Sequence, residues 1–361
     1  MKAFCSIILV ALCLVQAEAA TKKLNIDTKR YARICQNRSP VEDNDKRGHA
    51  IIRIAIESSS LTSILSKDSP QHNSMCWMIH DDPRRADPRG NKAKFLERYA
   101  LINLYMNTKG PGWSRSDHWL SKDDICDWYG IKCTRPMFST KPRVTSIDLG
   151  FNKVTGIIPA EIGYLTEVTD FDLNGNSLQG VLPTLMFRKM TKLQKLNLHM
   201  NDMFGEIPRE IGLLKNLKEL TLFGNFFFGR VPTEITHLKK LENLDLYANN
   251  LTGPVPAGIG KLKKLSKYFY DVHASCCLCL IYNADSKCVL QITEEFYIND
   301  NEVSGRMPKE VCDLKLEHLV SDCLGARPEV PCACCTICCQ GLPEPMCRDM
   351  RSPKKQKKKK K

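Results

Sequence analysis

Cysteine thiols are the most abundant reactive groups in this chain. There are 18 cysteines, and all except Cys5 and Cys13 lie beyond residue 19. They fall into even groups: Cys35 with Cys76, Cys126 with Cys133, four in 276–288 and eight in 312–347. Even grouping favours disulfides formed in an oxidising compartment. The C-x-C-C-x-x-C-C run at 332–339 also has a spacing compatible with a thiolate metal cluster, but an oxidising compartment favours disulfides, and we expect no metal.

The histidines and carboxylates show no catalytic pattern. HExxH, GxSxG, phosphate-binding-loop and protein-kinase signatures are all missing from the sequence. The eight histidines are scattered singly. The pairs Asp81-Asp82 and Asp123-Asp124 fall at expected helix ends or loops, where capping explains them. We therefore expect no catalysis and no cofactor.

A repeat of about 24 residues from Val144 to Lys264 must position any binding chemistry. Five segments share the template LxxLxLxxNxLxGxIPxxIGxLxx, whose period indicates a solenoid. The apolar strand positions point inward, the glycine permits a bend, and the proline excludes regular helix and favours an extended convex segment. An asparagine at each turn can satisfy unpaired backbone groups. These asparagines are Asn152, Asn176, Asn201, Asn225 and Asn249.

The GxIPxxIG half of the template resembles plant-type leucine-rich repeat proteins, namely the ectodomains of receptor-like proteins and the secreted polygalacturonase inhibitors. The resemblance implies an α/β solenoid: a right-handed superhelix with a parallel concave β-sheet, a helical N-terminal region and Cys-rich caps. It also implies a concave face that recognises peptides or wall-derived ligands. About seven coils are expected over 144–316.

The template gives the solvent-facing strand positions of the concave sheet. Small polar residues occupy these positions in the early coils, and aromatic residues gather in the later ones. Exposed aromatics on a rigid sheet mark recognition sites, although such neighbours can also simply pack against each other along the ladder. The candidate ligand-binding residues are Asp148, Asp172, His199, Phe223, Asp245, Tyr247, Phe269, Asp271 and Tyr297.

Residues 112–143 are predicted to cap the first coil, whose apolar end must be covered. The motif W…C-x-W-x-G-x-x-C resembles the N-terminal cap of plant-type repeat proteins and is matched by Cys126, Trp128, Gly130 and Cys133. A short loop in an oxidising compartment predicts a disulfide between Cys126 and Cys133.

The N-terminal segments precede this cap. Residues 1–19 have the positive charge, apolar stretch and small-x-small site of a secretory signal peptide. Residues 20–46 are polar and predict a loose leader. Residues 47–111 predict a helical region: one helical face over 47–67, a short helix that begins at Pro70, and a third helix through Phe95 and Tyr105.

The repeat pattern decays after Lys264. We interpret 265–292 as a degenerate coil, with an insertion over 268–295 within one coil or a translated intron as the alternatives. Residues 317–347 predict a Cys-rich C-terminal cap, and 348–361 a basic disordered tail. That tail could instead grip anionic polysaccharide or lipid head groups.

These features predict a secreted or cell-surface protein that binds a protein, peptide or glycan and engages a co-receptor. An inhibitor of a secreted wall-degrading hydrolase and a structural or adhesion protein of the wall are the alternatives. Residues 351–361 supply eight of the 13 net positive charges, so the body offers little for nucleic acid. No transmembrane helix is expected after the signal peptide. Asn250-Leu251-Thr252 is a glycosylation sequon on an exposed turn, at Asn250.

Overall fold

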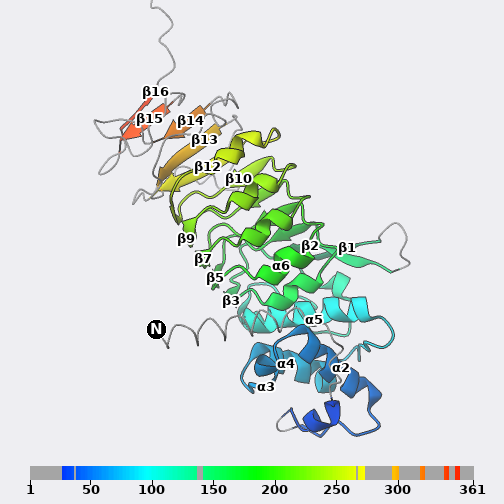
Figure 1. Ribbon diagram of the computed structural model, residues 1–361. Coiled ribbons are helices and arrows are strands. Elements are labelled where there is room, and N and C mark those ends of the chain that lie inside the picture. The colour runs from blue at the N-terminus through cyan, green and yellow to red at the C-terminus, as the bar shows by residue number, and fades with distance from the viewer. Residues whose placement is uncertain are drawn as a thin grey trace, which may run out of the picture.

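The computed structural model describes residues 27–35, 38–135 and 141–265, and beyond them the backbone of further strands (Figure 1). These residues form an α/β solenoid with a helical region at its N-terminal end. The predicted signal peptide 1–19 and the tail 348–361, apart from the end of the last strand, lie outside the described residues. Across the described part of the chain, no helix has the length and apolar character needed to cross a bilayer.

One eleven-stranded sheet runs along the solenoid. Its strands are parallel except at the two ends, where β1–β2 and β15–β16 are antiparallel. Because each coil contributes one strand in register with the next, equivalent template positions line up across the sheet. In sheet order, the strands are β1 (Ile131–Thr134), β2 (Arg143–Asp148), β4 (Asp170–Asp172), β6 (Lys195–Asn197), β8 (Glu219–Thr221), β10 (Asn243–Asp245), β12 (Lys267–Val272), β13 (Glu295–Asp300), β14 (His318–Ser321), β15 (Ile337–Gln340) and β16 (Met346–Asp349).

A second set of short strands lies along one side of the stack (Figure 1). They form a two-stranded and a three-stranded parallel ladder, one strand per coil. These strands are β3 (Thr155–Ile157), β5 (Ser177–Gln179), β7 (Phe204–Glu206), β9 (Phe226–Arg230) and β11 (Asn250–Thr252).

The convex side carries one short helix per coil instead of the extended segment that the prolines predicted. Each helix begins directly after the template proline, which occupies its N-cap position and is extended in the first four coils. Proline therefore marks the start of each short helix. Its ring prevents the helix from extending further back, and its missing N–H group is one that the first helical turn does not need. The helices are η5 (Ala160–Tyr164), α6 (Thr184–Lys189), η6 (Arg209–Leu213), η7 (Thr233–His237) and η8 (Ala257–Lys261).

The interior is a column of apolar side chains crossed by hydrogen-bonded asparagines. Leu220 and Leu244 are fully buried and lie opposite each other in adjacent strands. Asn201 shows the role of its column: its Nδ2 donates to the Leu173 carbonyl at 3.0 Å and to the Leu198 carbonyl at 3.1 Å, while its Oδ1 accepts from the Leu178 N–H at 3.0 Å. Each buried amide thus ties one coil to the preceding coil and satisfies turn groups that would otherwise be unpaired.

The helical region covers the start of the stack (Figure 1). The third predicted helix is observed as a single helix. The helical face predicted over 47–67 is instead divided into two helices, which are separated at Ser59 and Ser60. Ser60 accepts a hydrogen bond from the Ser63 N–H and starts a new helix there. The elements are η1 (Thr28–Tyr31), α2 (Lys46–Ser58), α3 (Leu61–Leu65), α4 (Pro70–Cys76), η2 (Trp77–Asp81) and α5 (Lys92–Asn107).

The described part of 20–46 is packed, in contrast to the loose leader predicted there. Cys35 forms a disulfide with Cys76 of α4, and Val41 is buried. Asp45 caps α2 by accepting from the Gly48 N–H at 2.8 Å. The polar composition of this segment concealed its few anchoring residues, and one long-range covalent link is enough to hold it.

An aromatic cluster and a disulfide form the predicted cap beside α5. The rings of Trp113 and Trp119 lie 4.8 Å apart, and those of Trp119 and Trp128 lie 4.9 Å apart. Cys126 and Cys133 are joined by a disulfide between η4 (Ile125–Asp127) and β1. Another short turn, η3 (Gly110–Gly112), leads from α5 into this cluster.

Contacts with α5 bind the helical region to the first coil. Arg143 donates from Nε to the buried carboxylate of Glu97 at 2.6 Å. Gly156 has a φ of +85°, and a Cβ there would lie 2.2 Å from the Asn107 carbonyl oxygen. The backbones approach so closely that only glycine fits, which seals the apolar end of the solenoid.

At the other end, β12 and β13 are separate neighbouring strands. Tyr268 pairs with Phe296 and Phe269 with Tyr297. The segment interpreted as a degenerate coil therefore contributes a separate strand, β12, to the sheet. Strands β14 and β15 continue the parallel ladder into the segment predicted as the C-terminal cap. The cysteine side chains of 276–288 and 312–347 lie outside the described residues.

Candidate ligand-binding surface

The concave face is built from side chains that alternate with the buried leucines of each strand. Asp172 ends β4 and pairs in the ladder with Asp148 on one side and Asn197 on the other. Asp245 ends β10 and pairs with Thr221. Alternation along a strand places these residues, and those two positions further on, on the opposite side from the core. The structure therefore brings Asp148, Asp172 and Asp245 onto one face.

Three rings from successive coils form a row on this face. His199 and Phe223 stack with centroids 4.3 Å apart and planes inclined by 12°. Phe223 and Tyr247 are 6.4 Å apart at 54°. His199 and Phe223 are half-buried, and Tyr247 is 37% exposed. We call these three residues the aromatic row.

A chain of hydrogen bonds fixes the first ring of the aromatic row. Asn197 donates from Nδ2 to Asp172 Oδ2 at 2.9 Å, so its Oδ1 faces His199 Nδ1 at 2.5 Å. An amide oxygen can only accept, and Nδ1 of His199 therefore carries a proton. Burial lowers the pKa of His199, although Asp172 opposes this effect. This lowering of the pKa favours the neutral imidazole, whose Nε2 is an acceptor when Nδ1 carries the proton.

The aspartates of the concave face also have a local structural role. Asp172 Oδ1 accepts from the Asn174 N–H at 3.1 Å, and Asp245 Oδ1 accepts from the Tyr247 N–H at 3.2 Å. This side-chain turn recurs in different coils and fixes the backbone where each strand ends. Burial raises the pKa of Asp245 to about 7. The sequence pattern identified these residues as solvent-facing and gave no sign of this backbone role.

The remaining candidates lie on the two strands that extend the sheet. Phe269 pairs with Asp245 in the ladder, and Tyr297 pairs with Phe269. Asp271 lies two residues beyond Phe269 on β12. The backbone of these strands thus continues the same face. The structure describes only the backbone at these three residues.

Two sets of exposed apolar side chains were not anticipated from the sequence. Phe151 and Met200 lie at the corner after the concave strand, where both have positive φ values. A second set lies along the side strands: Ile157, Phe204, Phe226 and Phe228 project from the strands themselves, and Val181 follows two residues after β5. The template marked their positions as variable, and reading them coil by coil would have exposed the run of aromatics.

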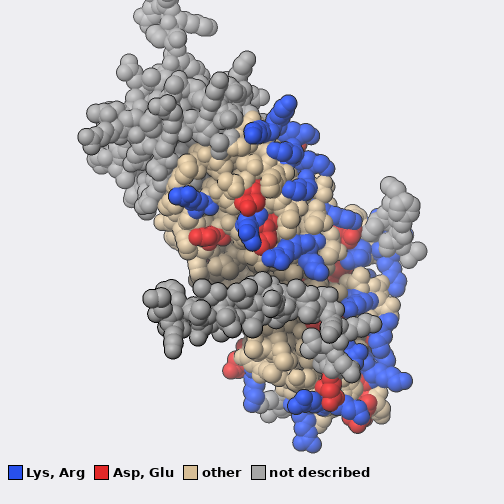
Figure 2. Space-filling view, viewed as in Figure 1, with Lys and Arg blue, Asp and Glu red and all other residues tan. Residues whose placement is uncertain are grey.

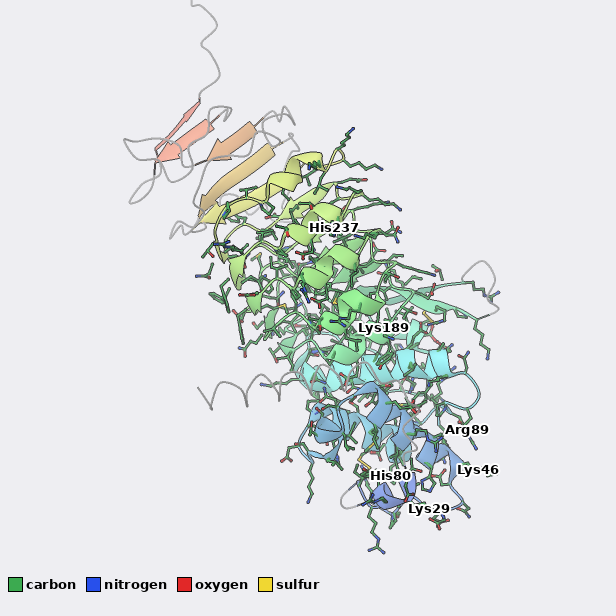
Figure 3. All side chains as sticks on the ribbon, viewed as in Figure 1. Lys29, Lys46, His80, Arg89, Lys189 and His237 are labelled. Carbon is green, nitrogen blue, oxygen red and sulfur yellow. A yellow bond between two sulfur atoms is a disulfide. The ribbon has the colours of Figure 1, made fainter. Side chains whose placement is uncertain are left out.

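The convex face differs in character. In Figure 2, Lys and Arg side chains are interspersed with acidic ones over the described coils. Several of them pair between neighbouring coils, as Lys192 does with Glu167 at 2.6 Å and Arg188 with Glu210 at 2.9 Å. Figure 3 labels Lys189 and His237 on the short helices of this side. Exposed pairs of this kind add little stability and show no convergent site.

No grouping of metal-ligating side chains occurs among the described residues: none brings together three or more His, Cys, Asp or Glu in a geometry for a metal ion. Among the buried carboxylates, Asp82 pairs with Arg98 at 2.7 Å and Glu97 with Arg143 at 2.6 Å, whereas Glu161 accepts hydrogen bonds from Ser59 and Gln71. The described part of the concave face presents rings and hydrogen-bonding groups.

Comparison with known proteins identifies the repeats. The family model described as Leucine Rich Repeat matches residues 240–262. Phytosulfokine receptor 1 of Arabidopsis thaliana is 31% identical over 118 residues, which is 33% of this chain and 11% of the receptor. Receptor-like kinase TMK4 of the same plant is 34% identical over 87 residues, or 24% of this chain and 8% of the kinase. The chain thus spans only about a tenth of the length of these curated relatives.

Solved leucine-rich repeat ectodomains also align with this chain. The ectodomain of the receptor kinase SOBIR1 from Arabidopsis thaliana has 25% sequence identity and a TM-score of 0.42, with 48% of this chain and 90% of that chain covered. The PEPR1–AtPEP1 complex has 25% identity and a TM-score of 0.47, with 65% and 30% covered.

Proposed function

Because this chain is a leucine-rich repeat protein of the plant type, we propose that it is a recognition protein that binds a peptide or another extended ligand on its concave face. The observation that carries this proposal is the aromatic row. Three rings from three coils stand in line, with Asp172 hydrogen-bonded into the same network and Asp245 beside Tyr247. A rigid sheet that presents a partly exposed line of rings offers binding energy at little entropic cost.

The charge of this face supports a ligand that carries a basic group. Asp148 is exposed and Asp172 pairs with it in the ladder, whereas the raised pKa of Asp245 makes that group a weaker source of negative charge. A ligand lying across the strands would place an apolar side chain on the rings and a cation near these carboxylates. Side-chain pockets along a fixed backbone ladder are a common basis of peptide specificity.

Secretion or display at the cell surface is part of the proposal. Both disulfides, Cys35–Cys76 and Cys126–Cys133, are of the kind that persists in an oxidising compartment. The sequence signs of a signal peptide agree with this location.

The test is affinity capture with the purified chain lacking residues 1–19. The immobilised protein is incubated with extracellular fluid and captured molecules are identified by mass spectrometry. We expect a peptide or small protein whose affinity falls when the aromatic row is changed. Capture of an intact hydrolase whose activity is blocked would instead show that this chain is a hydrolase inhibitor. Binding that survives changes in the aromatic row would refute the concave-face proposal.

A further inference from the structure

The side strands carry a row of exposed side chains of mixed chemistry. Along β9, Phe226 and Phe228 are exposed while Phe227 between them is fully buried. The ladder places Phe228 between Glu206 of β7 and Asn250 of β11. All three residues are exposed and occupy one register row, so their side chains project from the same face.

Asn250 is the acceptor position of the sequon Asn250-Leu251-Thr252. In a parallel ladder, directly paired residues are close enough for their side chains to interact. A sugar attached to Asn250 would therefore start beside the exposed ring of Phe228. We propose that Asn250 carries an N-linked glycan whose first N-acetylglucosamine packs on Phe228 and shields this part of the side sheet.

Polar groups flank Phe228 along its own register row and suit a carbohydrate, whereas the exposed rings of Phe226 and Phe204 occupy the neighbouring row. The Glu206 side chain lies against Gly229, with its Cγ 3.0 Å from the position of a Cβ there. Arg230 lies against Gly253 in the same way, beside the sequon residue Thr252. An aromatic platform flanked by a carboxylate and a guanidinium matches a sugar ring, because its C–H groups pack on the ring while its hydroxyls bond to the charged groups.

The attachment is an ordinary substitution with a lipid-linked oligosaccharide as the co-substrate. The Asn250 amide nitrogen forms a bond to C1 of the first sugar. The bond between C1 and the lipid diphosphate oxygen breaks, the diphosphate leaves with the bonding electrons, and the amide nitrogen loses one proton. The reaction requires passage through the secretory pathway and is independent of what the concave face binds.

Occupancy is tested on the full chain secreted from a plant or insect cell line. Mass spectrometry of the peptide containing Asn250 should show an added oligosaccharide, which the variant Thr252→Ala should lack. The packing is tested by melting temperature after trimming to a single sugar, compared with Thr252→Ala. A sugar–ring contact should raise the melting temperature by roughly 1–4 °C, the shift expected for one cross-strand pair in a domain of this size.

Phe228→Ala should abolish this gain. Phe204→Ala is the matched control, since Phe204 and Phe228 are both 48% exposed but Phe204 lies in the row of Phe226 instead of that of Asn250. The gain should persist in the control. As a readout that needs no variant, the acetamido methyl protons of the sugar should be shifted upfield by the Phe228 ring. An unmodified Asn250, or a gain unchanged in Phe228→Ala together with an unshifted methyl signal, would overturn the proposal.

Discussion

His199 and Phe223 lie one coil apart and stack with their ring centroids 4.3 Å from each other. The sheet register brings the two residues together, and the Asp172–Asn197 hydrogen bonds hold the imidazole in place. The aromatic row is thus partly packed against itself before any ligand arrives. Packing along the ladder and recognition are compatible, because a ring held in one rotamer loses less entropy on binding.

This stack predicts a small, specific contribution of His199 to stability. His199→Ala should lower the free energy of unfolding by about 1 kcal/mol, as expected for one ring pair across a sheet. His237→Ala, on the exposed end of η7 (Figure 3), should change it by less than about 0.5 kcal/mol. Urea unfolding of the two variants is the measurement, and equal effects would contradict the role given to the stack.

Asp245 predicts a pH dependence of stability. An unfolded aspartate has a pKa of about 3.9, whereas burial raises the folded pKa of Asp245 to about 7. Between these values the folded state keeps a proton that the unfolded state has released. The stability that Asp245 contributes is therefore full below about pH 4 and is lost as the pH rises to about 7.

The variant Asp245→Asn resembles the protonated form and should remove this decline. Its melting temperature should exceed that of the native chain most clearly above pH 7, as measured by thermal unfolding from pH 4 to 8. Asp148→Asn, at the equivalent exposed position of the first coil, is the control and should leave the decline in place. A parallel pH profile for the native chain and Asp245→Asn would mean that Asp245 is not the titrating group.

The cap disulfide should contribute measurably despite its short loop. Replacing Cys126 and Cys133 together by Ser should lower stability by about 2–3 kcal/mol, the loop-entropy value for a short closure. Denaturant unfolding of the purified variant tests this. A native digest without reduction should also yield the linked peptides, and two free thiols there would contradict the structure.

Leu244 tests the register of the interior. Leu244→Ala should cost about 2–5 kcal/mol, because coils fixed on both sides cannot collapse around the cavity. Lys240→Ala, four residues earlier and exposed, loses only a surface hydrogen bond to Asn216 and should cost almost nothing. Similar melting temperatures for the two variants would place Leu244 outside the core.

The sequence predicted those features that a strict period determines. Leu220, Leu244 and the asparagine column follow from the template, because every coil must bury the same positions and satisfy the same turn groups. The concave positions of His199 and Phe223 follow from the same register. Their stacking does not, since it depends on rotamers and on the hydrogen bond that His199 Nδ1 donates to Asn197 Oδ1.

Other features lay beyond any local pattern. The anchoring of 27–46 depends on Cys35 meeting Cys76, 41 residues away, and on burial of Val41. The division of 47–67 depends on Ser60 competing for a backbone N–H group, which hydrophobic periodicity does not register. The exposed row at Phe226 and Phe228 occupies positions where the template tolerates any residue.

The most direct test of concave-face recognition is a binding measurement on the double variant Phe223→Ala, Tyr247→Ala. Its affinity for the molecule captured by the native chain should fall by roughly 30-fold or more, equivalent to about 2 kcal/mol from buried aromatic contacts. The double variant should lose less stability than Leu244→Ala. The convex double variant Glu234→Ala, Lys239→Ala should bind like the native chain. Unchanged affinity in the Phe223, Tyr247 variant, together with a large fall in its melting temperature, would show that the aromatic row is packing and that the ligand binds elsewhere.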